Sequence, residues 1–144
     1  MRPLRPAECG PLAEALAAIE PWLTLGYGAA ALARYLERDD PALRRLVIER
    51  DGRPAGLLAL RAPWLRGPYI EMLAVPPEGQ GTGLGRAMVE WAAGQDSGNL
   101  WACVSAFNAQ ARAFYARLGF TEVATLPDLV APGFDEILVR LRPR

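Results

Sequence analysis

Apolar residues recur every three or four positions in two segments near the start of the chain. The stripes consist of Leu12, Ala15, Leu16 and Ile19 in the first segment, and of Ala29, Leu32, Ala33 and Leu36 in the second. This spacing is the period of an amphipathic helix that turns one face toward a core. We therefore expect helices over residues 6–19 and 27–38, each of which ends shortly before a proline.

Shorter apolar runs bounded by turn residues predict the strands. They lie at residues 1–5, 43–50, 53–64, 69–75, 100–105, 120–126 and 134–142. Asp51-Gly52 separates the second run from the third, and this dipeptide is a strong signal for a two-residue hairpin between antiparallel strands.

Two further helices are expected between the later strands, over residues 83–95 and 109–118. The first of them connects strand 69–75 to strand 100–105, and a helical crossover makes two such strands parallel. The pattern thus predicts one α/β domain over residues 1–144 with a mixed sheet. Its elements would follow the order β-α-α-β-β-β-α-β-α-β-β.

A glycine-rich loop stands between strand 69–75 and the helix after it. Its sequence from residue 76 to residue 86 is Pro-Pro-Glu-Gly-Gln-Gly-Thr-Gly-Leu-Gly-Arg. A loop that opens into a helix N-terminus presents unpaired backbone N–H groups and the positive end of the helix dipole, both of which favour bound phosphate. We interpret this stretch as a phosphate-binding loop, although a tight turn without a ligand would look the same.

Two common kinds of phosphate loop do not fit these residues. A Walker loop needs a lysine, and the chain contains none. The dinucleotide pattern G-x-G-x-x-G is also absent, because Gly81, Gly83 and Gly85 are spaced two and two. What remains is Q-x-x-G-x-G, formed by Gln80, Gly83 and Gly85, which resembles the acyl-CoA pyrophosphate loop of the GNAT family of N-acetyltransferases.

A second motif of the same family lies downstream. Residues 108–120 resemble the pattern N-x-x-A-x-x-F-Y-x-x-L-G-F, with matches at Asn108, Ala111, Phe114, Tyr115, Leu118, Gly119 and Phe120. Two motifs in the right order and at the right separation are more specific than either one. The resemblance covers almost the whole chain and implies the GNAT acyl-CoA N-acyltransferase fold. Asn108 and Gly119 also have a purely structural explanation, as the N-cap and the terminal glycine of a helix.

The resemblance implies acetyl-CoA as the cofactor. In the family, two parallel strands separate after the loop and the pantetheine arm lies between them. Carried over onto this chain, the cofactor-binding residues are Leu73, Ala74, Val75, Gln80, Gly81, Thr82, Gly83, Leu84, Gly85, Arg86, Asn108, Ala111 and Tyr115.

Two residues are candidates for proton transfer. Glu71 is the candidate base, because some family members carry a glutamate here that acts through water, and apolar surroundings would disfavour its charged form. The alternatives are a solvent-facing side chain or a partner for an arginine. Tyr115, from the Phe-Tyr pair of the second motif, is the candidate acid for the departing thiolate, or else a partly buried core residue.

The resemblance also implies an acceptor site. In the family it lies between the helix-helix loop and the last hairpin, and the residues that we expect there are Trp22, Tyr27, Glu71, Asp128 and Phe134. The two acidic groups favour an amine, which would be a small molecule or the N-terminal or lysine amine of a protein. Trp22 is equally compatible with simply capping the core.

Composition narrows the function further. Sixteen arginines balance sixteen acidic residues, so no net field would recruit nucleic acid or a membrane surface. Histidine is absent, which excludes Ser-His and Cys-His nucleophiles and the usual zinc sites, so we expect no metal. Two distant cysteines and no export signal indicate a cytoplasmic protein. Pairing through the exposed last strands would give a homodimer.

The motifs and candidate residues are compatible with two functions of different class. The first is an enzyme that moves an acetyl group from acetyl-CoA to a primary amine by direct attack. The alternative is a catalytically silent module that binds acyl-CoA as a sensor or partner domain. Glu71 and Tyr115 favour the enzyme.

Overall fold

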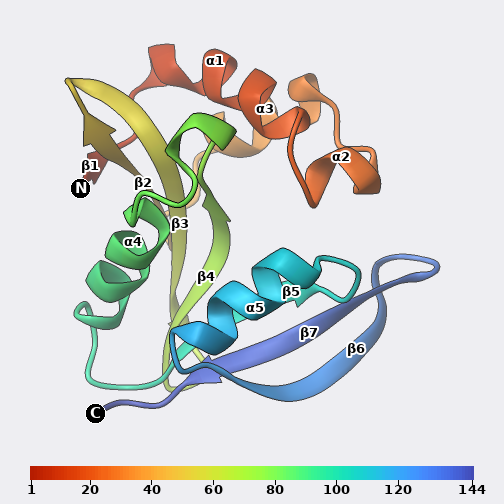
Figure 1. Ribbon diagram of the computed structural model, residues 1–144. Coiled ribbons are helices and arrows are strands. Elements are labelled where there is room, and N and C mark those ends of the chain that lie inside the picture. Colours follow the sequence, from red (N-terminus) through yellow and green to blue (C-terminus); the bar gives the residue numbers. More distant parts are fainter.

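Seven strands form one mixed sheet in the computed structural model, which describes residues 1–144 (Figure 1). The strand order across the sheet is β1-β2-β3-β4-β5-β7-β6. The strands are β1 (Arg2–Pro3), β2 (Leu43–Arg50), β3 (Arg53–Trp64), β4 (Gly67–Ala74), β5 (Leu100–Ser105), β6 (Thr121–Ala131) and β7 (Phe134–Leu141). The helices are α1 (Pro6–Ala17), α2 (Trp22–Leu25), α3 (Ala29–Glu37), α4 (Leu84–Ala93) and α5 (Ala109–Arg117). The predicted α/β fold and its order of elements are confirmed.

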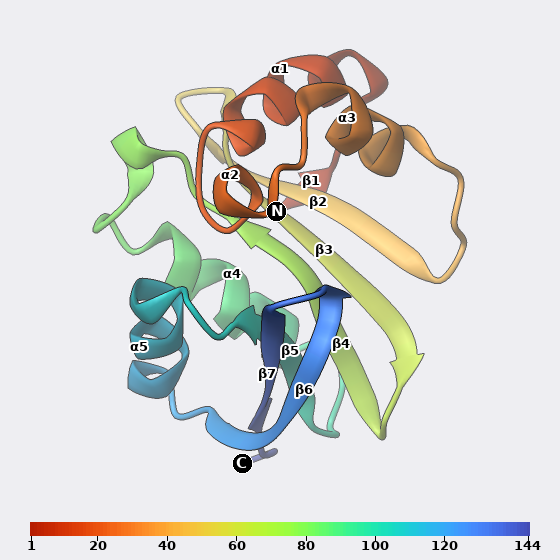
Figure 2. The ribbon, with the colours of Figure 1, turned by 90° about the vertical axis from the view of Figure 1, so that its right-hand side faces the viewer.

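Two hydrophobic cores lie on opposite faces of the sheet. Helices α1 and α3 cover one face, where Leu16 and Leu36 pack with Val47 of β2. Helices α4 and α5 cover the other face, where Met88 and Tyr115 pack with Leu58 of β3 (Figure 2). Burial of such side chains stabilises the domain by roughly 1.5 to 3 kcal/mol each. The apolar stripes seen in the sequence therefore face the sheet, as expected.

A β-bulge interrupts β4, a strand in the middle of the sheet. Ala59 lies opposite Met72 and Leu60 lies opposite Ile70, so that Glu71 is the extra residue of β4. A bulge shifts the alternation of side chains and increases the local twist of the strand. Ile70 accordingly packs on the α4 side of the sheet, whereas Met72 packs on the α1 side.

The parallel strands β4 and β5 are paired only at one end. Tyr69 lies opposite Trp101 and Ile70 opposite Ala102, and no later residues of the two strands pair. Beyond this point β5 is held on its other side by β7, over its full length from Leu100 to Ser105. The bulge at Glu71 begins where the pairing stops, so β4 turns away and leaves a gap in the sheet.

Three details differ from the prediction. The apolar loop before Tyr27 contains the short helix α2. A short 3₁₀ turn occupies Pro77–Gly79. Strand β6 continues to Ala131, five residues past its expected end at 126, and its side chains are mostly exposed at the sheet edge. No helix of the chain has both the length and the apolar character needed to span a membrane.

Candidate active site between strands β4 and β5

The glycine-rich loop presents a run of unused backbone donors. The N–H groups of residues 81–86 donate to no backbone or side-chain acceptor, and the first bond of the helix runs from Ala87 N to Gly83 O at 3.0 Å. The helix α4 starts inside this run, at Leu84. Six consecutive free N–H groups at a helix N-terminus form a site that attracts an anion of the size of a phosphate.

Side chains of the loop hold its backbone in place. The Gln80 side chain donates from Nε2 to the carbonyl oxygen of Val75, at 3.0 Å, and so closes the loop onto the end of β4. The Thr82 hydroxyl donates to the carbonyl oxygen of Gly79. Both bonds use side chains as donors and leave the N–H groups of the loop free.

Glycine is needed at two positions of the loop, for a different physical reason at each. Gly83 has a φ of +88°, a conformation that costs other residues about 1 kcal/mol or more, and the space beside its Cα is open. Gly85 has ordinary backbone geometry, but a Cβ atom there would lie 3.1 Å from the ring of Phe114. Gly85 thus allows α4 to approach α5 closely.

The gap in the sheet contains a cavity, which we call the inner cavity. It has a volume of about 350 Å³ and lies between Ile70–Leu73 of β4 and Cys103–Ser105 of β5. A second cavity of about 370 Å³, the connecting cavity, reaches from Leu73 toward the loop at Gln80 and Gly81. The two share Leu73, Asn108 and Ala111, among others. The two cavities therefore adjoin, and together they form a hollow that leads from Gly81 and Gly85 of the loop to the gap.

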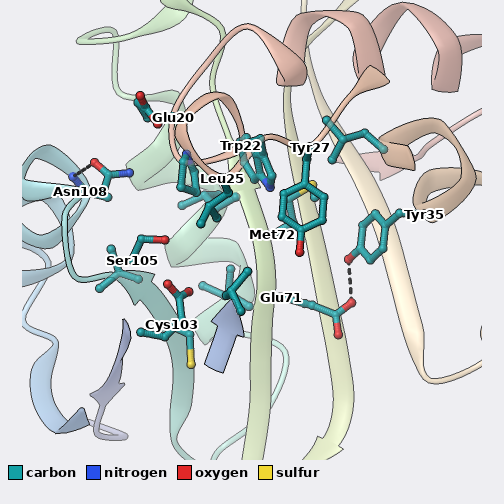
Figure 3. A pocket seen from close by; sticks show the side chains of 18 of the residues that line it. Glu20, Trp22, Leu25, Tyr27, Tyr35, Glu71, Met72, Cys103, Ser105 and Asn108 are labelled. Atoms are coloured by element: carbon teal, nitrogen blue, oxygen red, sulfur yellow. Dashed lines mark hydrogen bonds between the residues drawn. The ribbon is translucent and has the colours of Figure 1, made fainter. Parts of the chain in front are cut away.

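Glu71 lines the inner cavity, but it has strong partners (Figure 3). Arg61 donates to it from Nε at 2.8 Å and from Nη2 at 3.2 Å, and the Tyr35 hydroxyl donates to it at 2.7 Å. The apolar surroundings expected from the sequence are therefore absent, and the alternative that Glu71 pairs with an arginine is what the structure shows. Both of its oxygens are engaged.

Tyr115 lines the same cavity. Its side chain is buried and packs against Phe114 and Phe120, with ring centroids 5.3 and 5.1 Å apart. Burial raises its pKa strongly, and the nearby Cys103 thiol adds to the effect. The hydroxyl therefore keeps its proton and can act as a hydrogen-bond donor.

Asn108 and Ala111 stand where the two cavities meet. The Asn108 side chain caps α5 by accepting a hydrogen bond from Ala111 N, at 3.2 Å (Figure 3). The structural role expected for Asn108 is thus present. Its amide nitrogen has no protein partner and stays available to a ligand.

Only some of the residues predicted to bind the acceptor line the inner cavity. Trp22 and Tyr27, from α2 and the segment after it, line the inner cavity together with Glu71 (Figure 3). Asp128 and Phe134 do not line it. Asp128 instead accepts a hydrogen bond from Gly133 N in the β6-β7 hairpin, at 2.7 Å, and Phe134 packs edge-on against Phe107.

Glu136 of β7 lines the inner cavity and was not among the predicted site residues. Its exposed fraction is 9%, and its Oε2 atom is buried without a hydrogen-bond partner. Burial raises its pKa, and the Ser105 hydroxyl at the paired position of β5 opposes this to a smaller extent. The only sequence signal was an acidic residue inside an apolar strand, which does not reveal the face on which it lies.

A family model and several solved structures point to the same protein family. The family model "Acetyltransferase (GNAT) family" matches residues 12–120. No match was found among curated proteins. Among solved structures, a GNAT-family protein from Desulfovibrio desulfuricans is similar, with a TM-score of 0.80, 22% identity, and coverage of 99% of this chain and 96% of that one.

Two further structures extend the comparison. An acetyltransferase from Thermus thermophilus has a TM-score of 0.72 and 25% identity, with coverage of 97% of this chain and 95% of that one. An aminoglycoside 6'-N-acetyltransferase, crystallised with coenzyme A, has a TM-score of 0.78 and 14% identity, with coverage of 97% and 94%. At 14% and 22% identity, the likeness concerns the fold.

Proposed function

The chain belongs to the GNAT acetyltransferase family, and we propose that it transfers an acetyl group from acetyl-CoA to a primary amine by direct attack. Because the family consists of acetyltransferases, the chain is assigned to the acyltransferases. The choice of acetyl-CoA is supported by the coenzyme A in the similar aminoglycoside acetyltransferase and by the site described above. The acceptor is a small-molecule amine or the N-terminal or lysine amine of a protein.

One observation carries the proposal. Six free N–H groups, from Gly81 to Arg86, lie at one end of a hollow that leads into the gap between β4 and β5. The space beside Gly81 and Gly83 is open, so a diphosphate can approach the backbone there. A long ligand with an anionic end and a flexible arm fits this arrangement.

The residues that would hold acetyl-CoA follow from their positions. The loop residues 80–86 would bind the diphosphate, and Leu73, Ala74 and Val75 at the end of β4 would lie beside the pantetheine arm. Asn108 and Ala111 lie on its other side, on α5. When bound, acetyl-CoA supplies a thioester whose C–S bond breaks as the new C–N bond forms.

Tyr115 would donate a hydrogen bond to the leaving sulfur. Because burial raises its pKa, complete transfer of its proton to a thiolate is uphill, whereas a hydrogen bond to the developing charge needs no transfer. A preorganised donor of this kind contributes roughly 3 to 4 kcal/mol to the stability of a transition state.

Glu71, the base that the sequence predicts, lines the inner cavity, but its bonds to Arg61 and Tyr35 disfavour direct removal of a proton by it. Because Arg61 and Tyr35 occupy both of its oxygens, Glu71 would reach the amine only through a bridging water molecule. Trp22 and Tyr27 would contact the body of the acceptor, whereas Asp128 and Phe134 lie outside the lining of the cavity and are given no role.

A titration followed by a turnover assay tests the proposal. We expect acetyl-CoA to bind in calorimetry, and free thiol to appear when a panel of primary amines is added. The alternative, a silent acyl-CoA sensor or partner module, predicts equally tight binding with no thiol released by any amine. Absence of binding would refute both.

A further inference from the structure

The inner cavity carries an unusual combination of charge and burial. Three carboxylates line it, from Glu20, Glu71 and Glu136, and no arginine is among its lining residues. Fourteen of its twenty lining residues are hydrophobic. A cavity with acidic groups and no cation favours a positively charged ligand over one that carries a carboxylate.

Two of the three carboxylates already have partners. Glu71 is bound by Arg61 and Tyr35. Glu20 accepts hydrogen bonds from the backbone and hydroxyl of Thr24, at 3.1 and 2.6 Å, and so belongs to the start of α2. The charge of Glu71 is thus balanced by Arg61, and both oxygens of the exposed Glu20 are engaged by Thr24.

Glu136 is different, because it is buried and has no cationic partner. No arginine pairs with it, its Oε2 atom is buried without a hydrogen-bond partner, and the neutral Ser105 hydroxyl at the paired position of β5 lies beside it. A buried carboxylate without a charged partner is costly, so such a group is retained where a ligand completes its hydrogen bonds. An ammonium group, with three donors, is the complement of a carboxylate and a hydroxyl.

We propose that Glu136 is the binding partner of the acceptor ammonium and takes its proton, and that the inner cavity selects a small primary amine with one positive charge on an apolar body. This inference deepens the proposed function and rests on it for the transfer step. Aromatic rings from Trp22, Tyr27 and Tyr35 lie around the same cavity and suit an aryl or alkyl group (Figure 3). A polyamine would place further charges against apolar side chains, and an amino acid would find no partner for its carboxylate.

The proton balance of the step is simple. The ammonium gives one proton to the Glu136 carboxylate, which becomes a neutral acid. The amine that remains is neutral and has a free electron pair. That pair forms the C–N bond to the acetyl carbon while the C–S bond breaks. The second amine proton neutralises the departing sulfur, and Glu136 returns its proton to water. The burial that raises the pKa of Glu136 strengthens it as a proton acceptor.

Binding of amines in the absence of acetyl-CoA tests the inference without depending on turnover. We would titrate the whole protein with 2-phenylethylamine, hexylamine, spermidine and phenylalanine, and repeat the series with Glu136→Gln. We expect the two singly charged apolar amines to bind at least tenfold more tightly than spermidine or phenylalanine, and to lose at least tenfold in Glu136→Gln.

Glu122→Gln is the matched control, since it makes the same chemical change on β6, where Glu122 is exposed and pairs with Arg112. It should bind amines as the wild type does. Preferred binding of spermidine or phenylalanine would overturn the substrate class. Unchanged amine binding in Glu136→Gln would overturn the role of Glu136.

Turnover gives the second readout. With acetyl-CoA present, Glu136→Gln should lower kcat/KM for the amine by about 100-fold or more, as expected for loss of a positioned base. Its affinity for acetyl-CoA should stay within twofold of the wild type. Wild-type protein that binds amines as expected, yet binds no acetyl-CoA, would refute the proposed function while the amine site stands.

Discussion

Ile70 of β4 lies opposite Ala102 of β5, and this is the last pair that joins the two parallel strands. The next residue of β4, Glu71, is the extra residue of a bulge, so the strand turns away where the pairing ends. A sheet opened in this way exposes backbone and side chains of both strands to one cavity. The proposed chemistry depends on this separation, because it brings Tyr115 and Glu136 to the end of the hollow that starts at the glycine-rich loop.

The first prediction concerns the free N–H groups of the loop. Replacing Gly83 by Asp puts a negative charge beside them without a steric clash, since the space there is open. We expect the affinity for coenzyme A to fall by at least tenfold in calorimetry, because the charge repels the diphosphate. The positive φ of +88° would cost about 1 kcal/mol of stability as well.

Gly83→Asn separates these two effects. The Asn side chain has nearly the same shape as Asp and the same backbone strain at this position, but it carries no charge. The Asn variant should bind coenzyme A much more tightly than the Asp variant, at equal melting temperature. Equal affinities of the two variants for coenzyme A would contradict the assignment of a diphosphate to the loop.

The second prediction concerns the Tyr115 hydroxyl. Its ring packs between Phe114 and Phe120, and no hydrogen bond holds its oxygen, so Tyr115→Phe preserves the packing. We expect the melting temperature to change by less than about 2 °C, while kcat falls by roughly 100-fold. The KM for acetyl-CoA should change little, because the bond to sulfur matters mainly as charge develops. A variant with full kcat would reduce Tyr115 to a core residue.

The architecture could be predicted from the sequence because its signals are local. Asp51-Gly52 indicated the hairpin, and both residues adopt the positive φ that this turn requires, 52° and 74°. The helical crossover fixed β4 and β5 as parallel. The insertion of β7 between β5 and β6 was not predicted, because no local pattern tells which neighbour an antiparallel strand will choose.

The site was predicted only where backbone motifs define it. The loop follows from its glycines and Tyr115 from the resemblance to the second family motif, and the structure places both along one hollow. The partners of Glu71 could not be foreseen, since Arg61 and Tyr35 come from elements 10 and 36 residues away. Glu136 was missed for the same reason, because its burial depends on the order of the strands.

The third prediction addresses the ion pair of Glu71. Arg61 bridges Glu71 and Asp40, and about a quarter of each side chain of the Arg61–Glu71 pair is exposed. Glu71→Gln should lower the free energy of unfolding by about 1 to 2 kcal/mol, because a hydrogen-bonded charge loses its partner. We expect kcat to fall less than it does in Glu136→Gln. Chemical denaturation together with the thiol assay measures both quantities.

A double-mutant cycle shows whether the loss comes from this pair. Arg61→Ala, Glu71→Gln and the double variant should give a coupling energy on the order of 1 kcal/mol. If instead Glu71→Gln abolishes turnover and leaves stability unchanged, Glu71 is the base and the ion pair is incidental.

The fourth prediction uses the burial of Glu136. Because burial raises its pKa, the folded protein holds this proton more tightly than the unfolded chain does. Stability is then full at a pH below the pKa of the unfolded state, and decreases as the pH rises through the raised pKa of the folded state. Glu136→Gln stays neutral throughout, so it should be more stable than the wild type at pH 8, by the roughly 1 kcal/mol that an incompletely hydrogen-bonded buried group costs, or roughly 3 °C in Tm.

The difference should narrow as the pH falls through the raised pKa of Glu136, because the wild-type carboxyl then becomes protonated in the folded protein. Cys103 of β5 and Tyr69 of β4 lie near Glu136, but burial raises the pKa of each, so both stay neutral across this range. The carboxylates of Glu20 and Glu71 are present in both proteins and cancel in the comparison. Thermal unfolding of the two proteins at several pH values measures the effect. A constant difference in Tm would mean that Glu136 is solvated like a surface carboxylate, and would remove the physical reason for its pairing with an ammonium group.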